Sequence, residues 1–459
     1  MQDLTFRRRW EQSPALSAET CKYIGLLLQC QTKLWHFAFD CLVENEGLQY
    51  ICHGLRTNSG LQEVEISLRS LYDVEQLGKG LAANKSIRQL KIFNTPSEPL
   101  LILLTQLRKN QSITEVHIEN CLFTTGTILS GLKHLNAAKI KLSNVQLCKM
   151  TDAAIEGLKD CKCTELTILS STDSSNFGPV MEGLAQNTSI TKLSIIHNYQ
   201  GLISNAMAEH VALMLEQNNT ITDLDMNHRA NERHFNQPLV DFGFRMICEA
   251  LLKNNSLTKL DLGACRINDD LSALGDVLIH NTALKVLNLS GNWLNNPTLD
   301  KFCEVLKVNA TLHTLNLGGC SLSCGAMMNL AAVLHVNRSL TDLDISLHSP
   351  EFTQHMYPTL CSALKNNNTL KTVTMGFCDY RLESAGTLAS IADLIKTNTS
   401  ITRLTVRGDM LKSTKEVNII EFIEALKKNN TLTTLMCGPF TVLKTKQVDY
   451  YLKMRRIIP

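Results

Sequence analysis

A short phrase of alternating apolar and polar residues recurs along the chain. It begins with Asn, continues through a spacer and Ser or Thr to Leu or Ile, and places further apolar residues three and five positions later. Examples are NKSIRQLKI from Asn84 and NNSLTKLDL from Asn254. This alternation is typical of a β-strand with one buried face. The first Leu or Ile of each phrase is numbered position 0 of a repeat.

Position 0 marks about 15 repeats. Their mean period is roughly 28 residues, which lies within the range of repeat proteins that stack into solenoids. Position 0 falls at Leu34, Leu61, Ile87, Ile113, Ala137, Cys163, Ile190, Ile221, Leu257, Leu284, Leu312, Leu340, Leu370, Ile401 and Leu432. The phrases at Leu34, Ala137 and Cys163 fit the pattern less closely than the others.

The stretch before each Asn has helical spacing, as in LGDVLIHN up to Asn281. We expect Asn to close these helices in the left-handed conformation, which it tolerates better than most residues. Position +8 is often Cys or Asn, where a small polar side chain can bond to the backbone of a turn. These residues are Cys121, Asn198, Cys265, Asn292, Cys320 and Cys378. Each repeat is therefore predicted to be a strand, a turn and a helix.

Such repeats must stack, because neither the strand nor the helix can bury its apolar side alone. Stacked strands are about 4.8 Å apart and packed helices roughly 8–10 Å apart, so the stack must curve. The predicted fold is an α/β solenoid, a horseshoe with parallel strands on its concave face and helices on its convex face. We expect an N-terminal flank or cap at 1–17, the solenoid at 18–441 and a C-terminal capping helix at 442–459. The basic end of that helix is alternatively a docking or targeting element.

The repeat LxxLxLxxC/N, with its helix, its Asn turn and its period, resembles the leucine-rich repeats of the ribonuclease-inhibitor-like subfamily. The resemblance covers most of the chain, and similar repeats occur in NOD-like receptors and in effectors of intracellular bacteria. It implies a leucine-rich-repeat solenoid that binds proteins. It specifies the function poorly, because one fold hosts many functions.

Charge and composition narrow the classes of partner. The formal net charge of +2 and the aromatic content of 5% give neither a basic patch nor stacking platforms for nucleic acid. No apolar stretch approaches the roughly 20 residues of a membrane span, and no signal-peptide core is found. The 16 cysteines are then expected in a reducing compartment. We predict a cytoplasmic protein, in the host cytoplasm if it is a secreted bacterial effector.

The sequence contains no recognisable catalytic or metal-binding motif. Phosphate-binding glycine loops, HExxH, GxSxG and Cys-x-x-Cys are all missing. We therefore predict no enzyme, no cofactor, no metal and no small-molecule substrate. Cys161 and Cys163 are expected to pack in the core, and His36 and His117 to be solvated on the strands.

Polar residues at positions +2, +4 and +6 should project from the strands into the concave surface, which solenoids offer to partners. The predicted partner-binding residues there are Asp223, Asp225, Lys259, Asp261, Asp342, Asp344, Arg403 and Arg407. The longest interval between repeats, from Ile221 to Leu257, contains an insertion at 228–238. Insertions in repeats often emerge at the binding edge. The predicted contact residues in this loop are Arg229, Arg233, His234 and Phe235.

The favoured function is a non-enzymatic scaffold that binds a partner protein, as an effector or a regulatory protein. Two alternatives follow from resemblance alone. One is a regulator of a small GTPase, similar to Ran GTPase-activating protein. The other is an actin-capping module similar to tropomodulin, whose repeats use comparable NTSI and NNTL phrases.

Overall fold

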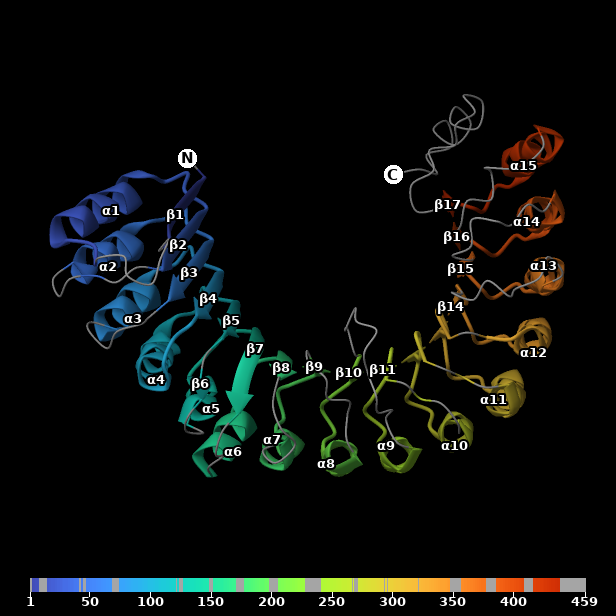
Figure 1. Ribbon diagram of the computed structural model, residues 1–459, viewed down its shortest axis with the longest axis horizontal. Helices are drawn as coiled ribbons and strands as arrows, with labels where there is room; N and C mark the ends of the chain where they lie inside the picture. The colour runs from blue at the N-terminus through green and yellow to red at the C-terminus, as the bar shows by residue number, and fades with distance from the viewer. Residues whose placement is uncertain are drawn as a thin grey trace. The chain divides into compact units, whose positions relative to one another are not determined.

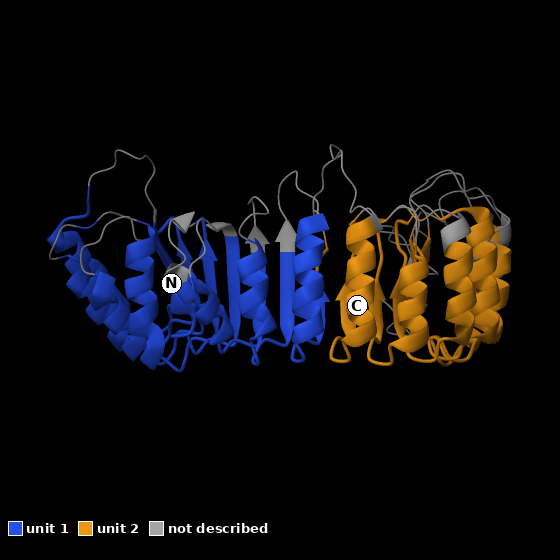
Figure 2. Ribbon diagram, turned by 90° about the horizontal axis from the view of Figure 1, so that it is seen from below, with its two compact units in different colours: residues 1–225, 229–235 blue, residues 226–228, 236–459 orange. Residues whose placement is uncertain are grey.

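The computed structural model describes most of the repeat region in two compact units. Unit 1 comprises Met1–Asp225 with Arg229–Phe235, and unit 2 comprises Met226–His228 with Asn236–Pro459 (Figure 2). The described residues are 2–7, 15–40, 43, 47–67, 74–120, 122–123, 127–147, 152–170, 177–197, 205–227, 241–265, 267, 271–292, 294, 296–320, 322–346, 356–376, 385–407 and 416–437.

Unit 1 alternates strands and helices along nearly its whole length (Figure 1). Its elements are β1 (Asp3–Arg7), α1 (Ala18–Cys30), β2 (His36–Asp40), α2 (Leu48–Thr57), β3 (Glu63–Ser67), α3 (Val74–Ala83), β4 (Gln89–Phe93), α4 (Ser97–Gln106), the 3-10 helix η1 (Leu107–Lys109), β5 (Glu115–Glu119), β6 (Leu122–Phe123), α5 (Thr127–Leu132), β7 (Lys139–Leu147), α6 (Asp152–Lys159), β8 (Glu165–Ser170), α7 (Phe177–Ala185), β9 (Lys192–His197), α8 (Asn205–Gln217) and β10 (Asp223–Asp225). Its strands pair in parallel in the order β1-β2-β3-β4-β5-β7-β8-β9-β10.

Unit 2 shows the same alternation. Its elements are α9 (Asp241–Lys253), β11 (Lys259–Asp261), α10 (Ser272–His280), β12 (Val286–Asn288), α11 (Asn296–Val308), β13 (Thr314–Asn316), α12 (Cys324–Val336), β14 (Asp342–Asp344), α13 (Met356–Asn366), β15 (Thr372–Gly376), α14 (Ala385–Thr397), β16 (Arg403–Arg407), α15 (Glu416–Lys428) and β17 (Thr434–Cys437). Its strands pair in parallel in sequence order from β11 to β17.

The predicted repeat is confirmed. Within the described residues, a strand begins at position +2 of every repeat, and the residue at position 0 is buried each time. Positions +3 and +5 are buried as well, for example Val64 and Ile66 in β3. Within each unit the helices lie on one side of the strands, and the core fills the layer between them (Figure 1). The α/β solenoid is the fold of this chain.

The Asn that follows most of the helices stabilises the stack in a different way from the predicted one. Asn58, Asn281 and Asn337 have extended backbones, with φ of −67°, −81° and −65°, so they are not left-handed. Their side chains act instead. Asn337 Nδ2 donates to the carbonyls of Leu306 (2.8 Å) and Asn309 (3.1 Å) in the preceding repeat.

The same side chain also closes its own turn. Asn337 Oδ1 accepts from the backbone N–H of Ser339 (3.0 Å) and Leu340 (2.9 Å). Equivalent bonds form at the buried Asn187 in unit 1. Buried backbone groups need such partners, and the Asn amide supplies two donor hydrogens on Nδ2 and an acceptor oxygen. This Asn ladder is common to both units.

The left-handed conformation occurs in the turn after the strand, at position +7. Non-glycine residues with positive φ in the described chain are Asn94 (49°), Asn120 (52°) and Ala264 (53°), all at this position. Gly291 and Gly319 occupy it with φ of 69° and 73°. Asn and Gly tolerate this region, whereas Ala264 has no such advantage.

Position +8 bonds to the backbone as predicted in the repeats where it is described. Cys265 Sγ lies 3.3 Å from the carbonyl oxygen of Met226, and Cys320 Sγ lies 3.0 Å from that of Leu289. Asn292 donates to the carbonyls of Leu262 and Leu289. Cys121, Asn198 and Cys378 lie outside the described residues.

Strand length depends on the residue at position +4. Asp261, Asn288, Asn316 and Asp344 each accept, through Oδ1, the backbone N–H two residues later at 2.9 Å. This Asx turn ends β11, β12, β13 and β14 after three residues. In unit 1, position +4 is Glu65 in β3, Lys91 in β4 and His117 in β5, and each of these strands continues for five residues. Longer side chains do not form this turn, so the strand extends.

The two ends of the chain are described unequally. Residues 3–7 of the predicted flank form β1, which pairs in parallel with β2 and extends the sheet by one strand. The capping helix predicted at 442–459 lies outside the described residues. Among the described helices, none is long and apolar enough to cross a membrane.

Candidate functional site

The face of each unit's sheet that is turned away from the helices is called here the open face. It carries the side chains at positions +2, +4 and +6, and the structure places all eight strand residues predicted to bind a partner on it. Asp223 and Asp225 belong to unit 1, and the other six to unit 2. The loop residues Arg229, Arg233, His234 and Phe235 lie outside the described residues.

Two of the predicted partner-binding carboxylates also accept hydrogen bonds from backbone N–H groups. Asp261 Oδ1 accepts from Gly263 N at 2.9 Å, from Asn288 Nδ2 at 2.8 Å and from Asn227 Nδ2 at 3.2 Å. Asp344 Oδ1 accepts from the backbone N–H and the hydroxyl of Ser346. This role was not predicted from the sequence, and for Asp261 two of the donors come from other repeats.

The two predicted arginines lie at the two ends of β16 in unit 2 and are exposed. Arg407 Nη2 is 3.8 Å from Asp344 Oδ2, although β15 lies between β14 and β16. The arginine side chain is 57% exposed, so this ion pair is largely solvated and contributes little stability. It leaves most of the guanidinium available to a partner.

Unit 1 carries a denser group of charges, which the repeat pattern places on this face but which were not among the predicted partner-binding residues. We call it the acidic face, made of open-face carboxylates on β2, β3 and β5: Asp40, Glu63, Glu65, Glu115 and Glu119. The one lysine of β2–β5 is Lys91 on β4. Its Nζ lies 3.3 Å from Glu119 Oε2 and 3.7 Å from Glu65 Oε1, so it bridges two strands.

His117 lies at the centre of β5, between charges of both signs. Its Nε2 is 2.6 Å from Ser143 Oγ and 4.0 Å from Glu119 Oε2. Burial lowers the pKa of His117 below its usual value, the positive charge of Lys141 lowers it further, and Glu119 opposes both. His117 was expected to be solvated, and it is instead half-buried and hydrogen-bonded.

The next strands of unit 1 change sign. Lys139 and Lys141 on β7 and Lys192 on β9 occupy open-face positions, with Glu165 on β8 between them. Lys139 Nζ pairs with Glu165 Oε2 at 3.2 Å. The open face of unit 1 is therefore acidic on β2–β5 and predominantly basic on β7–β9.

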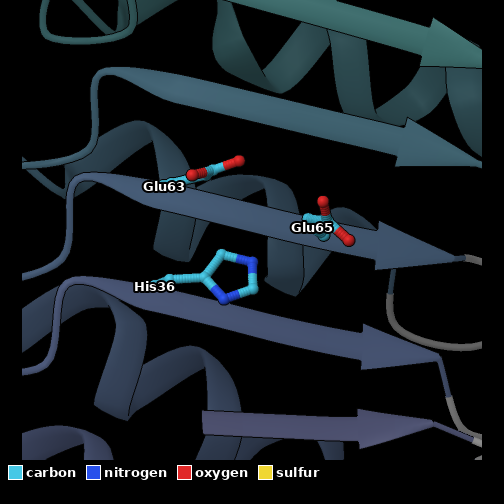
Figure 3. A group of neighbouring side chains, drawn as sticks. All are labelled: His36, Glu63 and Glu65. Atoms are coloured by element: carbon cyan, nitrogen blue, oxygen red, sulfur yellow. The ribbon is translucent and has the colours of Figure 1, made fainter. Parts of the chain in front are cut away.

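A second histidine on the open face lies beside two glutamates. His36 on β2 and Glu63 and Glu65 on β3 each place a ligand-type atom within 4.8 Å of the other two (Figure 3). Figure 3 shows the imidazole ring lying beside the two carboxylates on the same side of the sheet. Sequence spacing missed this group, because His36 lies one repeat before Glu63 and only the parallel register pairs them.

Cys161, Cys163, Cys265 and Cys320, singled out by the sequence pattern, are buried in the described part of the chain. Cys161 and Cys163 are buried with their sulfurs 3.3 Å apart. Their mutual hydrogen bond lowers the pKa of Cys161 and raises that of Cys163. Burial raises the pKa of Cys303, Cys320 and Cys361 to about 12, which keeps these thiols protonated near neutral pH.

Comparison with known proteins finds relatives that match parts of the chain, while no family model matches it. The human NACHT, LRR and PYD domains-containing protein 13 is 26% identical over 266 residues, which cover 55% of this chain and 25% of that protein. The ribonuclease inhibitor of Sus scrofa is 33% identical over 94 residues, which cover 20% of this chain and 19% of that protein. The matches thus span a quarter or less of the length of these relatives.

Two solved structures are also similar in part. An internalin from Listeria monocytogenes aligns over 92% of this chain and 94% of its own, with a TM-score of 0.40 and 15% identity. The actin-binding site 2 of leiomodin-1 aligns over 32% of this chain and 82% of its own, with a TM-score of 0.27 and 19% identity. The observed repeat and the two sequence relatives support a leucine-rich-repeat protein of the ribonuclease-inhibitor-like type.

Proposed function

We propose that the chain is a non-enzymatic interaction scaffold that binds a partner protein through the open face of its repeats. Its acidic face is the primary contact, and the partner presents a basic docking surface. The observation that carries this proposal is the excess of negative charge on β2–β5. One lysine lies among five carboxylates there, those of Asp40, Glu63, Glu65, Glu115 and Glu119. The repeat type of the relatives supports the scaffold role in general.

Charge complementarity gives such a face specificity and speed of association more than raw affinity. A basic surface approaching β2–β5 meets several carboxylates held at fixed spacing, because adjacent parallel strands lie about 4.8 Å apart. The same face repels an acidic surface. The partner-binding residues predicted from the sequence, Asp223, Asp225, Lys259, Asp342, Arg403 and Arg407, remain proposed further contacts.

The test begins with affinity purification and mass spectrometry from the natural host cell, and then uses the purified partner. We expect Glu63→Lys combined with Glu115→Lys to weaken binding at least tenfold, because each reversal turns attraction into repulsion. The matched control is Glu209→Lys on α8, which makes the same charge change at an exposed helix position. Wild-type binding should also weaken as salt rises.

The proposed contact is wrong if the double variant, folded by circular dichroism, binds the purified partner as tightly as wild type. The same conclusion follows if Glu209→Lys weakens binding equally. Asp223→Asn with Asp225→Asn provides a separate arm. Loss of binding there with no effect at Glu63 and Glu115 would place the contact on β10 and reject the acidic face.

A further inference from the structure

We propose that His36, Glu63 and Glu65 form a binding site for a divalent transition-metal cation of the Zn²⁺ class on the open face of unit 1. The inference is independent of any protein partner. Its basis is the mutual distance of the three ligand-type atoms, all within 4.8 Å of one another (Figure 3).

The backbone presents these ligands from two adjacent strands. His36 and Glu63 are direct register partners across the parallel β2–β3 pair, and Glu65 follows on the same face two residues later. Zinc ligands lie about 2.0–2.2 Å from the metal, so in a tetrahedral site they are separated by roughly 3.5 Å. Rotations of the three side chains that move their ligand atoms by about an ångström would bring these atoms to that spacing without a movement of the strands.

The donor set favours zinc over the hard cations. One imidazole nitrogen with two carboxylates suits Zn²⁺ or a similar transition metal, whereas Ca²⁺ takes six to eight oxygen ligands. Three protein ligands also leave a fourth position open toward the free side of the sheet. That arrangement is found where a zinc ion keeps a water or an incoming ligand.

Asp3 on β1 supports the orientation of the histidine. It is the register partner of His36 on the other side of β2, and its Oδ1 lies 3.7 Å from His36 Nδ1. With Nδ1 directed to a carboxylate, Nε2 is the nitrogen left for the metal. A carboxylate behind a metal-bound histidine fixes the tautomer and the ring orientation. His36 is only 16% exposed, so its ring is already largely ordered.

The charges nearby favour a cation here. Among the described residues, Glu63 has no ion-pair partner. Lys91 Nζ lies 3.7 Å from Glu65 Oε1 and closer to Glu119 Oε2, at 3.3 Å. Two carboxylates two residues apart on one strand repel each other, and a shared cation removes that repulsion.

A second group on the same face provides an internal control. Glu115, His117 and Glu119 on β5 have the same residue types, but His117 Nε2 is bound to Ser143 Oγ at 2.6 Å. The positive charges of Lys141 and Lys91 also act on His117. In the β5 group the imidazole Nε2 is therefore already engaged. Lys91 lies near both groups, so the additional positive charge at the β5 group is that of Lys141.

The test titrates the full chain, freed of metal by a chelator, with Zn²⁺ and with Co²⁺ as a spectroscopic probe. We expect one saturable equivalent whose Co²⁺ spectrum lacks a thiolate charge-transfer band. His36→Gln and Glu63→Gln should each remove this equivalent, and Asp3→Asn should weaken it about tenfold. His117→Gln is the matched control and should bind as wild type.

Circular dichroism of every variant confirms the fold before the titration is interpreted. The site is rejected if wild type binds no equivalent, or if His36→Gln and Glu63→Gln bind like wild type. A thiolate band on the equivalent that these variants remove rejects it as well, because the cation would then be held by cysteines. Displacement of Zn²⁺ by an equal concentration of Ca²⁺ would reject the transition-metal assignment.

Discussion

The open faces of the two units are built on the same backbone pattern and differ in chemistry. On β2–β5 of unit 1, five carboxylates and one lysine lie on five-residue strands, and the lysine lies within ion-pair distance of two of the carboxylates. On β11–β14 of unit 2, the same positions carry mainly Asn, Asp and Thr on three-residue strands. The difference in strand length follows from position +4, where the side chains of Asp and Asn accept a hydrogen bond from the backbone and those of Glu, Lys and His do not.

This comparison separates open-face charges that are free to bind from those that hold the fold. Asp261 and Asp344 have carboxylates engaged by backbone N–H groups, so replacing them changes structure and surface together. Glu63 and Glu115 have no backbone role among the described residues, so their charges can be changed with little effect on the fold. Charge alone, without strand position, does not make this distinction.

The largest predicted effect concerns what the units share. Asn187→Ala in unit 1 and Asn337→Ala in unit 2 should each lower the free energy of unfolding by about 4 kcal/mol, since several buried backbone groups lose their partners at about 1–3 kcal/mol each. Chemical denaturation followed by circular dichroism measures this loss. Thr188→Ala, at the exposed neighbouring position, should have almost no effect. A loss below about 1 kcal/mol in either unit would contradict the ladder.

The next effect tests the difference at position +4. Asp261→Ala should destabilise the chain by about 2 kcal/mol, because Gly263 N and two amide groups lose their acceptor. Asp261→Asn keeps an acceptor oxygen and should cost less than about 1 kcal/mol. Glu65→Ala, the counterpart in unit 1, loses only a partly solvated ion pair and should also cost less than about 1 kcal/mol. Equal losses for Asp261→Ala and Glu65→Ala would remove the distinction between the units.

The smallest predicted effect is a shift in the pKa of His117 in unit 1. The pKa of His117, measured by NMR, should lie below its usual 6.5, and Lys141→Met should raise it toward that value. Because the folded-state pKa is depressed, His117 contributes full stability above pH 6.5 and loses it as pH falls through the folded-state pKa. An unchanged pKa in Lys141→Met would show that Lys141 does not contribute to the shift.

The fold could be predicted from the regular alternation of apolar and polar residues in each repeat. Leu257, Leu260 and Leu262 alternate with polar residues, and the same pattern returns in each repeat, so strand, turn and helix followed directly. The role of Asn337 was predicted in the correct place but with the wrong mechanism. The reason is that its side chain donates to carbonyls of the preceding repeat, which only stacking brings near.

The sequence by itself determined the repeat, its register and the buried side of every strand, because these depend on local periodicity. Only the tertiary structure decided which open-face groups meet. His36 joins Glu63 and Glu65, and Lys91 bridges Glu65 and Glu119, because parallel pairing places residues of successive repeats side by side. Equal positions of successive repeats pair in this way, but the side-chain contacts between them form only once the repeats are stacked.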